Sequence, residues 1–136
     1  MTARVMEIYH DALGVPALNS QTIGADGAVN GASVDIAGFH ALLFLVQSGT
    51  ITDGAYDLKL QESDDASAWS DVSSDEQLGS PDYALADDNV VKRIGYIGKK
   101  RYVRLVITAS SVTSGGVFSA IALKAQPLHA PVADDV

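Results

Sequence analysis

The histidines are the first side chains in this sequence whose type could support chemistry. His10, His40 and His129 lie far apart, and no H-E-x-x-H or H-x-H spacing joins them into a metal-binding pattern. No G-x-S-x-G elbow is present for a serine nucleophile, and the absence of cysteine excludes disulfides and thiolate sites. The sequence therefore predicts no catalytic residues, no bound metal and no cofactor, and a protein that is not an enzyme.

Carboxylates are concentrated in one segment, which raises the question of a calcium site. Residues 62–88 include nine acidic side chains and no basic one. The EF-hand order D-x-[DN]-x-[DN]-G is absent, and Asp71 and Asp75 are separated by Val-Ser-Ser. We interpret the segment as a long solvated excursion from the fold, anchored by the rings of Trp69 and Tyr83.

Trp69 is the single tryptophan of the chain and lies within this acidic segment. A lone tryptophan in a loop of a β-protein can stack on a sugar ring, as in carbohydrate-binding modules. More often it closes the edge of the core, because one ring removes on the order of 200 Å² from water. With no second aromatic residue beside it, we interpret Trp69 as a loop anchor and keep sugar binding as the alternative.

Positive charge is concentrated just after the acidic segment. Residues 92–104 hold six of the nine lysines and arginines. Four of these cations make up what we call the basic cluster: Lys99, Lys100, Arg101 and Arg104. Tyr96 and Tyr102 lie among these cations, as aromatic residues do on surfaces that bind single-stranded nucleic acid. The net charge of −8 on the whole chain argues against nucleic-acid binding. The cluster pairs either with the chain's own Asp87 and Asp88 or with an acidic partner surface, and we predict the partner.

Length and composition bound the class of protein. The 136 residues are 47% apolar and 19% charged, which fits one folded domain and excludes a disordered chain. The longest apolar run, residues 41–46, is far shorter than the ~20 residues needed to cross a membrane. The first residues lack a cationic stretch followed by an apolar one, so we expect no secretory leader and no membrane partner.

Strand signals dominate the pattern along the chain. Four segments are apolar, alternating or rich in β-branched residues: 38–47, 56–61, 102–108 and 117–124. Turn pairs such as Asp53-Gly54 and Gly115-Gly116 separate them. The uniformly apolar segment 38–47 is typical of a central strand covered on both faces. We predict an all-β fold, either a compact sandwich or a jelly-roll-like barrel.

The two ends are expected to differ from this single domain, which spans residues 1–136. Residues 1–30 are predicted to hold an arm or a short helix followed by the first strand, because Ile8, Ala12 and their neighbours have helical spacing. Residues 127–136 contain two prolines, so we expect them to leave the sheet as an arm.

Two segments of the chain resemble each other. Residues 43–61 and 105–126 each contain an apolar strand, a Ser/Thr-rich turn ending in glycine, an aromatic residue and a strand that closes on glutamine. This similarity predicts two hairpins of one design, one in each layer of a sandwich.

Most of the chain, roughly residues 31–132, resembles a family of small structural proteins from the head-gene region of tailed phages and prophages. The most specific matches are the FLVQSGTITDG turn, the RIGYIGKKRYVR segment and the ending HAPV. The resemblance implies a virion protein, made in the bacterial cytoplasm and carried on the outside of the capsid. It favours a decoration (cement) protein that binds the major capsid protein, commonly as a trimer.

This resemblance also suggests where the partner binds. Together with the charge pattern it favours the basic cluster, and it adds His129 and Pro131 of the terminal HAPV motif. Head–tail and tail structural proteins remain open as other virion roles. A carbohydrate-binding module is the alternative from a different class.

Overall fold

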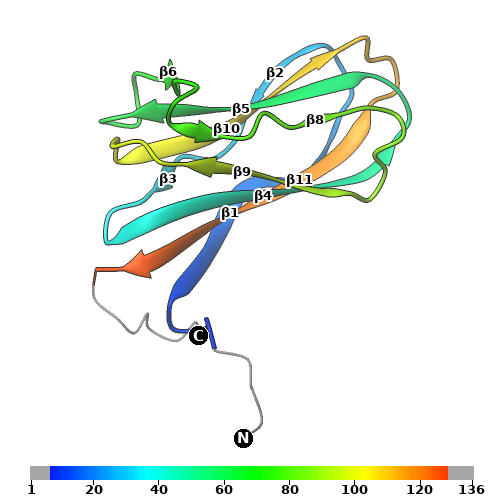
Figure 1. The fold of residues 1–136 in the computed structure, drawn as a ribbon. Coiled ribbons are helices and arrows are strands. Elements are labelled where there is room, and N and C mark those ends of the chain that lie inside the picture. The colour runs from blue at the N-terminus through cyan, green and yellow to red at the C-terminus, as the bar shows by residue number, and fades with distance from the viewer. Residues whose placement is uncertain (1–6, 129–136) are drawn as a thin grey trace, which may run out of the picture.

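Residues 7–128 are described by the computed structural model, and they fold as two packed layers of antiparallel strands (Figure 1). Within this range there are eleven strands and no helix. The predicted all-β sandwich is therefore confirmed. No helix in the described part of the chain is long and apolar enough to span a membrane.

The first layer, sheet A, has five strands in the spatial order β1-β11-β4-β9-β7. Its strands are β1 (Ala12–Ile23), β11 (Gly116–Pro127), β4 (Phe39–Ile51), β9 (Val91–Tyr96) and β7 (Gln77–Leu78). All neighbouring pairs are antiparallel.

The second layer, sheet B, is built around the antiparallel pair of β10 and β5. Its strands are β10 (Tyr102–Ser110) and β5 (Ala55–Ser63), with β2 (Gly27–Asn30) and β3 (Val34–Asp35) along β10, and β6 (Ser70–Asp71) and β8 (Asp82–Tyr83) along β5. The lower and upper layers of Figure 1 are sheets A and B.

Period-two alternation fills the space between the sheets. In β5, Tyr56, Leu58 and Leu60 are buried, while the polar residues between them face outward. The centre of the core is aromatic: the ring of Phe118 lies 4.7 Å from that of Tyr56 and 5.2 Å from that of Tyr83. Tilted and edge-on contacts of this kind add to the burial of apolar area.

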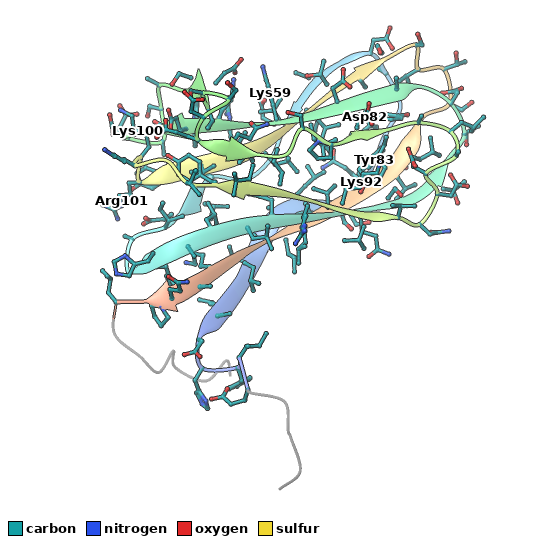
Figure 2. All side chains as sticks on the ribbon, viewed as in Figure 1. Lys59, Asp82, Tyr83, Lys92, Lys100 and Arg101 are labelled. Carbon is teal, nitrogen blue, oxygen red and sulfur yellow. The ribbon has the colours of Figure 1, made fainter. Side chains whose placement is uncertain are left out.

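Tyr83 anchors the acidic segment to this core, as predicted. Its side chain is buried, and its hydroxyl lies 2.9 Å from the carbonyl oxygens of both Val46 and Val90. Burial raises the pKa of the Tyr83 phenol to about 12. The Lys92 ammonium lies 4.9 Å from the ring centroid, and Figure 2 shows the two side chains together.

The two similar segments are not hairpins, which corrects that prediction. In the first, β4 belongs to sheet A and β5 to sheet B; in the second, β10 belongs to sheet B and β11 to sheet A. Each segment is therefore an arch that crosses between the layers. The two arches stack, because β4 pairs with β11 and β5 pairs with β10.

One carboxylate joins the two arches. Asp53, in the first arch, accepts hydrogen bonds from three consecutive backbone amides of the second: Thr113 at 3.0 Å, Ser114 at 2.9 Å and Gly115 at 2.9 Å. These bonds hold the pKa of Asp53 below its usual range. The carboxylate thus fixes one crossover on the other.

The N-terminal region is extended rather than helical over the residues that the structure describes. Asp11 N–H donates to the Ile8 carbonyl in a turn, and β1 begins at Ala12. Ala12 and Leu13, which have helical spacing with Ile8, are instead paired with β11. Pairing along β11 outweighs the weak propensity of so short a helix.

The C-terminal arm begins later than predicted. Strand β11 continues to Pro127, which lies opposite Phe39, and Leu128 N–H donates to the Gly38 carbonyl at 2.8 Å. A proline is tolerated here because it ends the strand rather than interrupting it. His129 and Pro131 lie outside the described residues.

Candidate functional site: the basic cluster and the outer face of sheet A

The basic cluster lies where the chain passes from one layer to the other. Lys99, Lys100 and Arg101 belong to the connection between β9 and β10, and Arg104 belongs to β10. Figure 2 shows Lys100 and Arg101 at one end of the sandwich.

Arg101 forms a two-pronged ion pair with Asp35 of β3. Its Nε and Nη2 atoms donate to the two carboxylate oxygens at 3.0 and 2.9 Å. These hydrogen bonds hold the pKa of Asp35 below its usual range. The guanidinium also lies 5.1 Å from the ring centroid of Tyr102. Both charged groups remain substantially exposed, so the pair is accessible to solvent and salt.

Lys100 is tied to the acidic segment through two contacts. Its Nζ lies 2.7 Å from Oδ2 of Asp64, and this hydrogen bond raises the pKa of the ammonium. Its backbone N–H donates to the hydroxyl of Tyr96 at 2.9 Å, and that hydroxyl donates to Glu62 at 2.7 Å. Burial raises the pKa of Tyr96.

Arg104 and Trp69 form the third part of the cluster. The guanidinium donates to Oε1 of Gln61 at 3.0 and 2.7 Å and lies 4.5 Å from the centroid of the Trp69 ring. Trp69 is half-buried and is not part of the core. It therefore anchors its loop through a cation–π contact on the surface of sheet B, rather than by closing the core edge.

The expected internal partners of the cluster, Asp87 and Asp88, are used elsewhere. Asp87 pairs with Lys92 at 3.5 Å, and Asp88 accepts a hydrogen bond from the Ile51 amide at 2.8 Å. The cluster is paired internally all the same, but with Asp35 and Asp64. Lys99 is exposed and makes no ion pair within residues 7–128.

The carboxylates predict how stability depends on pH. Hydrogen bonds hold the pKa values of Asp35, Asp53 and Asp71 below their usual range, so the folded state binds fewer protons than the unfolded state. Their contribution is present above the unfolded value of about 3.9 and is lost as pH falls through the folded values. We expect the melting temperature to drop on acidification from pH 6 to pH 3. Asp53→Asn should be less stable at pH 7 and lose less on acidification; a flat profile for the wild type would contradict this.

The second candidate surface is the outer face of sheet A. On this side of β4 and β11 the outward residues alternate with the buried ones, and no further layer covers them among residues 7–128. The large side chains that define this face are Leu43, Leu45, Leu78, Val91, Ile121 and Leu123. The expectation that segment 38–47 is covered on both faces therefore holds for one face only within the described chain.

This face is apolar and poor in charge. Ile121 is 48% exposed, Leu78 55% and Val91 57%. Over the described strands Arg93 of β9 is the one charged residue at an outward position, with Asp11 at the opposite margin. A chain with a net charge of −8 thus keeps nearly all of its charge off this surface.

The face is also hollowed where β1 departs from regular pairing. The register of β1 with β11 shifts between Pro16 and Leu18 and again between Leu18 and Gln21. A hollow of about 610 Å³ opens there, lined in part by Pro16, Leu45 and Ile121. Depletion of charge and an uneven apolar surface are typical of the centre of a protein interface.

The histidines do not come together. His40 is exposed on β4, His10 lies in the turn before β1 beside Glu7, and His129 is outside the described range. No group of three histidine, aspartate or glutamate residues within positions 7–128 is placed to hold a metal ion. No protein-family model matches the chain, and no curated protein is significantly similar to it.

Proposed function

We propose that this protein is a structural component of a phage virion, a decoration protein that binds the outer surface of the capsid. The resemblance of its turn and basic segments to small phage head-region proteins supports this role. The observation that carries the proposal is the basic cluster: Lys99 is exposed, and Lys100 and Arg101 lie in exposed ion pairs, so the cluster is open to an acidic partner surface.

The basic cluster is the surface that meets the capsid. Lys99 is exposed, and Lys100 and Arg101 are held in exposed ion pairs. Exposed ion pairs contribute little to stability, so carboxylates of the capsid can replace Asp64 and Asp35 at little cost. The cluster also attracts an acidic shell from a distance, which speeds attachment.

Charge reversal tests this contact. We expect Lys99→Glu to weaken attachment to capsids that lack the protein, and Lys99→Glu combined with Lys100→Glu to weaken it further. Wild-type attachment should loosen as salt rises, because the Debye length falls to about 8 Å at physiological ionic strength. Co-sedimentation with such capsids, followed by quantitative gels, measures the occupancy.

Lys59→Glu is the matched control. It changes the net charge by the same amount as Lys99→Glu, but Lys59 pairs with Asp71 on sheet B, and Figure 2 shows Lys59 apart from Lys100 and Arg101. The control should attach normally. Equal occupancy of all variants, without salt dependence in the wild type, would remove the basic cluster from the capsid contact. No attachment of the wild type at any salt concentration would contradict the proposed function itself.

A further inference from the structure

We propose that the outer face of sheet A binds the same face of a second copy of this chain, in a pair related by a two-fold axis parallel to β4. The pairing goes beyond the virion role and does not depend on it. It concerns sheet A alone and leaves the basic cluster, at the end of the sandwich, free for another partner.

The register of the strands makes this face self-complementary. One row across sheet A contains, from β1 to β7, Gly14, Leu123, Leu43, Gly95 and Leu78, because each is paired with the next across the sheet. An axis along the central strand β4 reverses the order of this row in the second copy. Leu123 then faces Gly95, Leu78 faces Gly14, and Leu43 faces Leu43. Each leucine off the axis therefore faces a row position that holds a glycine, open at Gly14 and covered by Leu78 at Gly95.

Gly14 leaves room for a side chain of the second copy, and Gly95 does not. No atom lies within 4 Å of the position that a Cβ on Gly14 would occupy, so this part of β1 is open to a side chain from outside. At Gly95 the corresponding position is filled by the Leu78 side chain of the same copy, whose Cβ is 3.2 Å away, and Gly95 is buried, so Leu123 of the second copy would pack on Leu78 above Gly95. Side chains of packed sheets interdigitate in this way.

The neighbouring row follows the same rule. Ile121, Leu45 and Arg93 are paired in succession across the sheet. The reversed row of the second copy places Leu45 against Leu45 and Ile121 against the aliphatic stem of Arg93. An arginine can cover an apolar neighbour with its stem while its charged end reaches solvent.

Charge favours this face over sheet B. Asp64 and Asp71 lie on the sheet B side, where they pair with Lys100 and Lys59. Packing two copies through sheet A keeps these carboxylates on the outside of the pair, a full sandwich thickness from the contact. Packing through sheet B would bring the acidic segments of two chains with net charge −8 together.

The area is at the lower limit for a specific pair. Four strands about 4.8 Å apart and seven residues of β4 at about 3.4 Å each give a face roughly 20 Å on each side, to which the two residues of β7 add one corner. Two such faces hide on the order of 1,000 Å² in total, which is the smallest area expected of a specific interface. A surface that is complementary to itself favours a two-fold pair over the three-fold arrangement that the family resemblance implies.

The mass in solution tests the pairing. Sedimentation equilibrium of the full chain at tens of micromolar should give about twice the mass of one 14.2 kDa chain. Ile121→Glu, which puts a carboxylate at a half-exposed position within the face, should reduce the mass to that of one chain. Val91→Glu serves as a second variant at another exposed position of the same face, in case Ile121→Glu disturbs folding.

Leu85→Glu is the control, because Leu85 is 61% exposed but lies in the loop after β8, outside sheet A. It should remain a pair, and circular dichroism should show all variants folded. A wild-type mass of one chain would overturn the proposal. The occupant of the face would then be residues 129–136 or a different protein. A mass of three chains, or pairs that persist in both face variants, would overturn it as well. None of these outcomes bears on capsid attachment.

Discussion

Phe118→Ala is expected to lower the free energy of unfolding by about 3–5 kcal/mol, as is usual for a buried phenylalanine. Phe118 is fully buried, and its ring contacts those of Tyr56 from sheet B and Tyr83 from the acidic segment. Alanine would remove one ring from a three-ring cluster that joins the two sheets and the acidic segment. Since a domain of this size is stable by only about 5–15 kcal/mol, the variant should be marginal.

Urea unfolding measures this loss through the shift of the midpoint. Leu85→Ala is the control for truncating an apolar side chain, because Leu85 is exposed and should cost less than about 0.5 kcal/mol. Phe118→Leu should lie between the two. A loss below about 1 kcal/mol for Phe118→Ala would mean that the aromatic cluster does not hold the layers together.

Gly115→Ala should prevent folding or nearly so. Gly115 has φ of +100°, which alanine rarely adopts, and an added Cβ would stand 2.2 Å from the carbonyl oxygen of Ile23. The obstacle is backbone on β1, so no side chain can move aside to relieve it. Any shift of Gly115 would also break its hydrogen bond to Asp53 and loosen the two arches.

The neighbouring Gly24→Ala is the matched control. Its added Cβ would meet nothing closer than the Ser114 carbonyl oxygen at 3.9 Å, an ordinary contact. Gly24→Ala should express and melt like the wild type, whereas Gly115→Ala should be insoluble or show no cooperative melting transition. Similar melting curves for the two variants would contradict the tight packing of the second arch on β1.

The strands with regular alternation or many β-branched residues could be predicted from the sequence, and others could not. Segments 38–47, 56–61, 102–108 and 117–124 all lie within the observed β4, β5, β10 and β11, apart from one residue at position 38. β1 is less regular, because it contains Pro16 and its pairing with β11 shifts register twice. Its partner strand, which lies about one hundred residues further along the chain, determines its conformation.

The paired arches show a limit of local patterns. The similarity between residues 43–61 and 105–126 is structural, but a strand–turn–strand sequence describes a hairpin and an arch equally well. What distinguishes them is the partner of each strand, and here those partners lie in the other arch. Asp53 illustrates this, because the amides it binds are about sixty residues away.

The two candidate surfaces could also be predicted only in part from the sequence. The basic cluster was visible in the sequence, but its partners Asp35 and Asp64 are 66 and 36 residues from Arg101 and Lys100, so their identity required the fold. The uncovered face of sheet A left a signal in the uniformly apolar segment 38–47. That signal by itself predicts a strand covered on both sides within one chain, whereas the described chain covers only one side.

The outer face of sheet A can be tested most directly by cross-linking, because the chain has no cysteine of its own. In the two-fold pair Leu43 faces Leu43 of the second copy, so Leu43→Cys should be joined rapidly into a covalent dimer by a short bismaleimide. Leu85→Cys, far from the contact, should remain a single chain under the same conditions. Equal and slow cross-linking of both variants would contradict the pairing of two copies through this face.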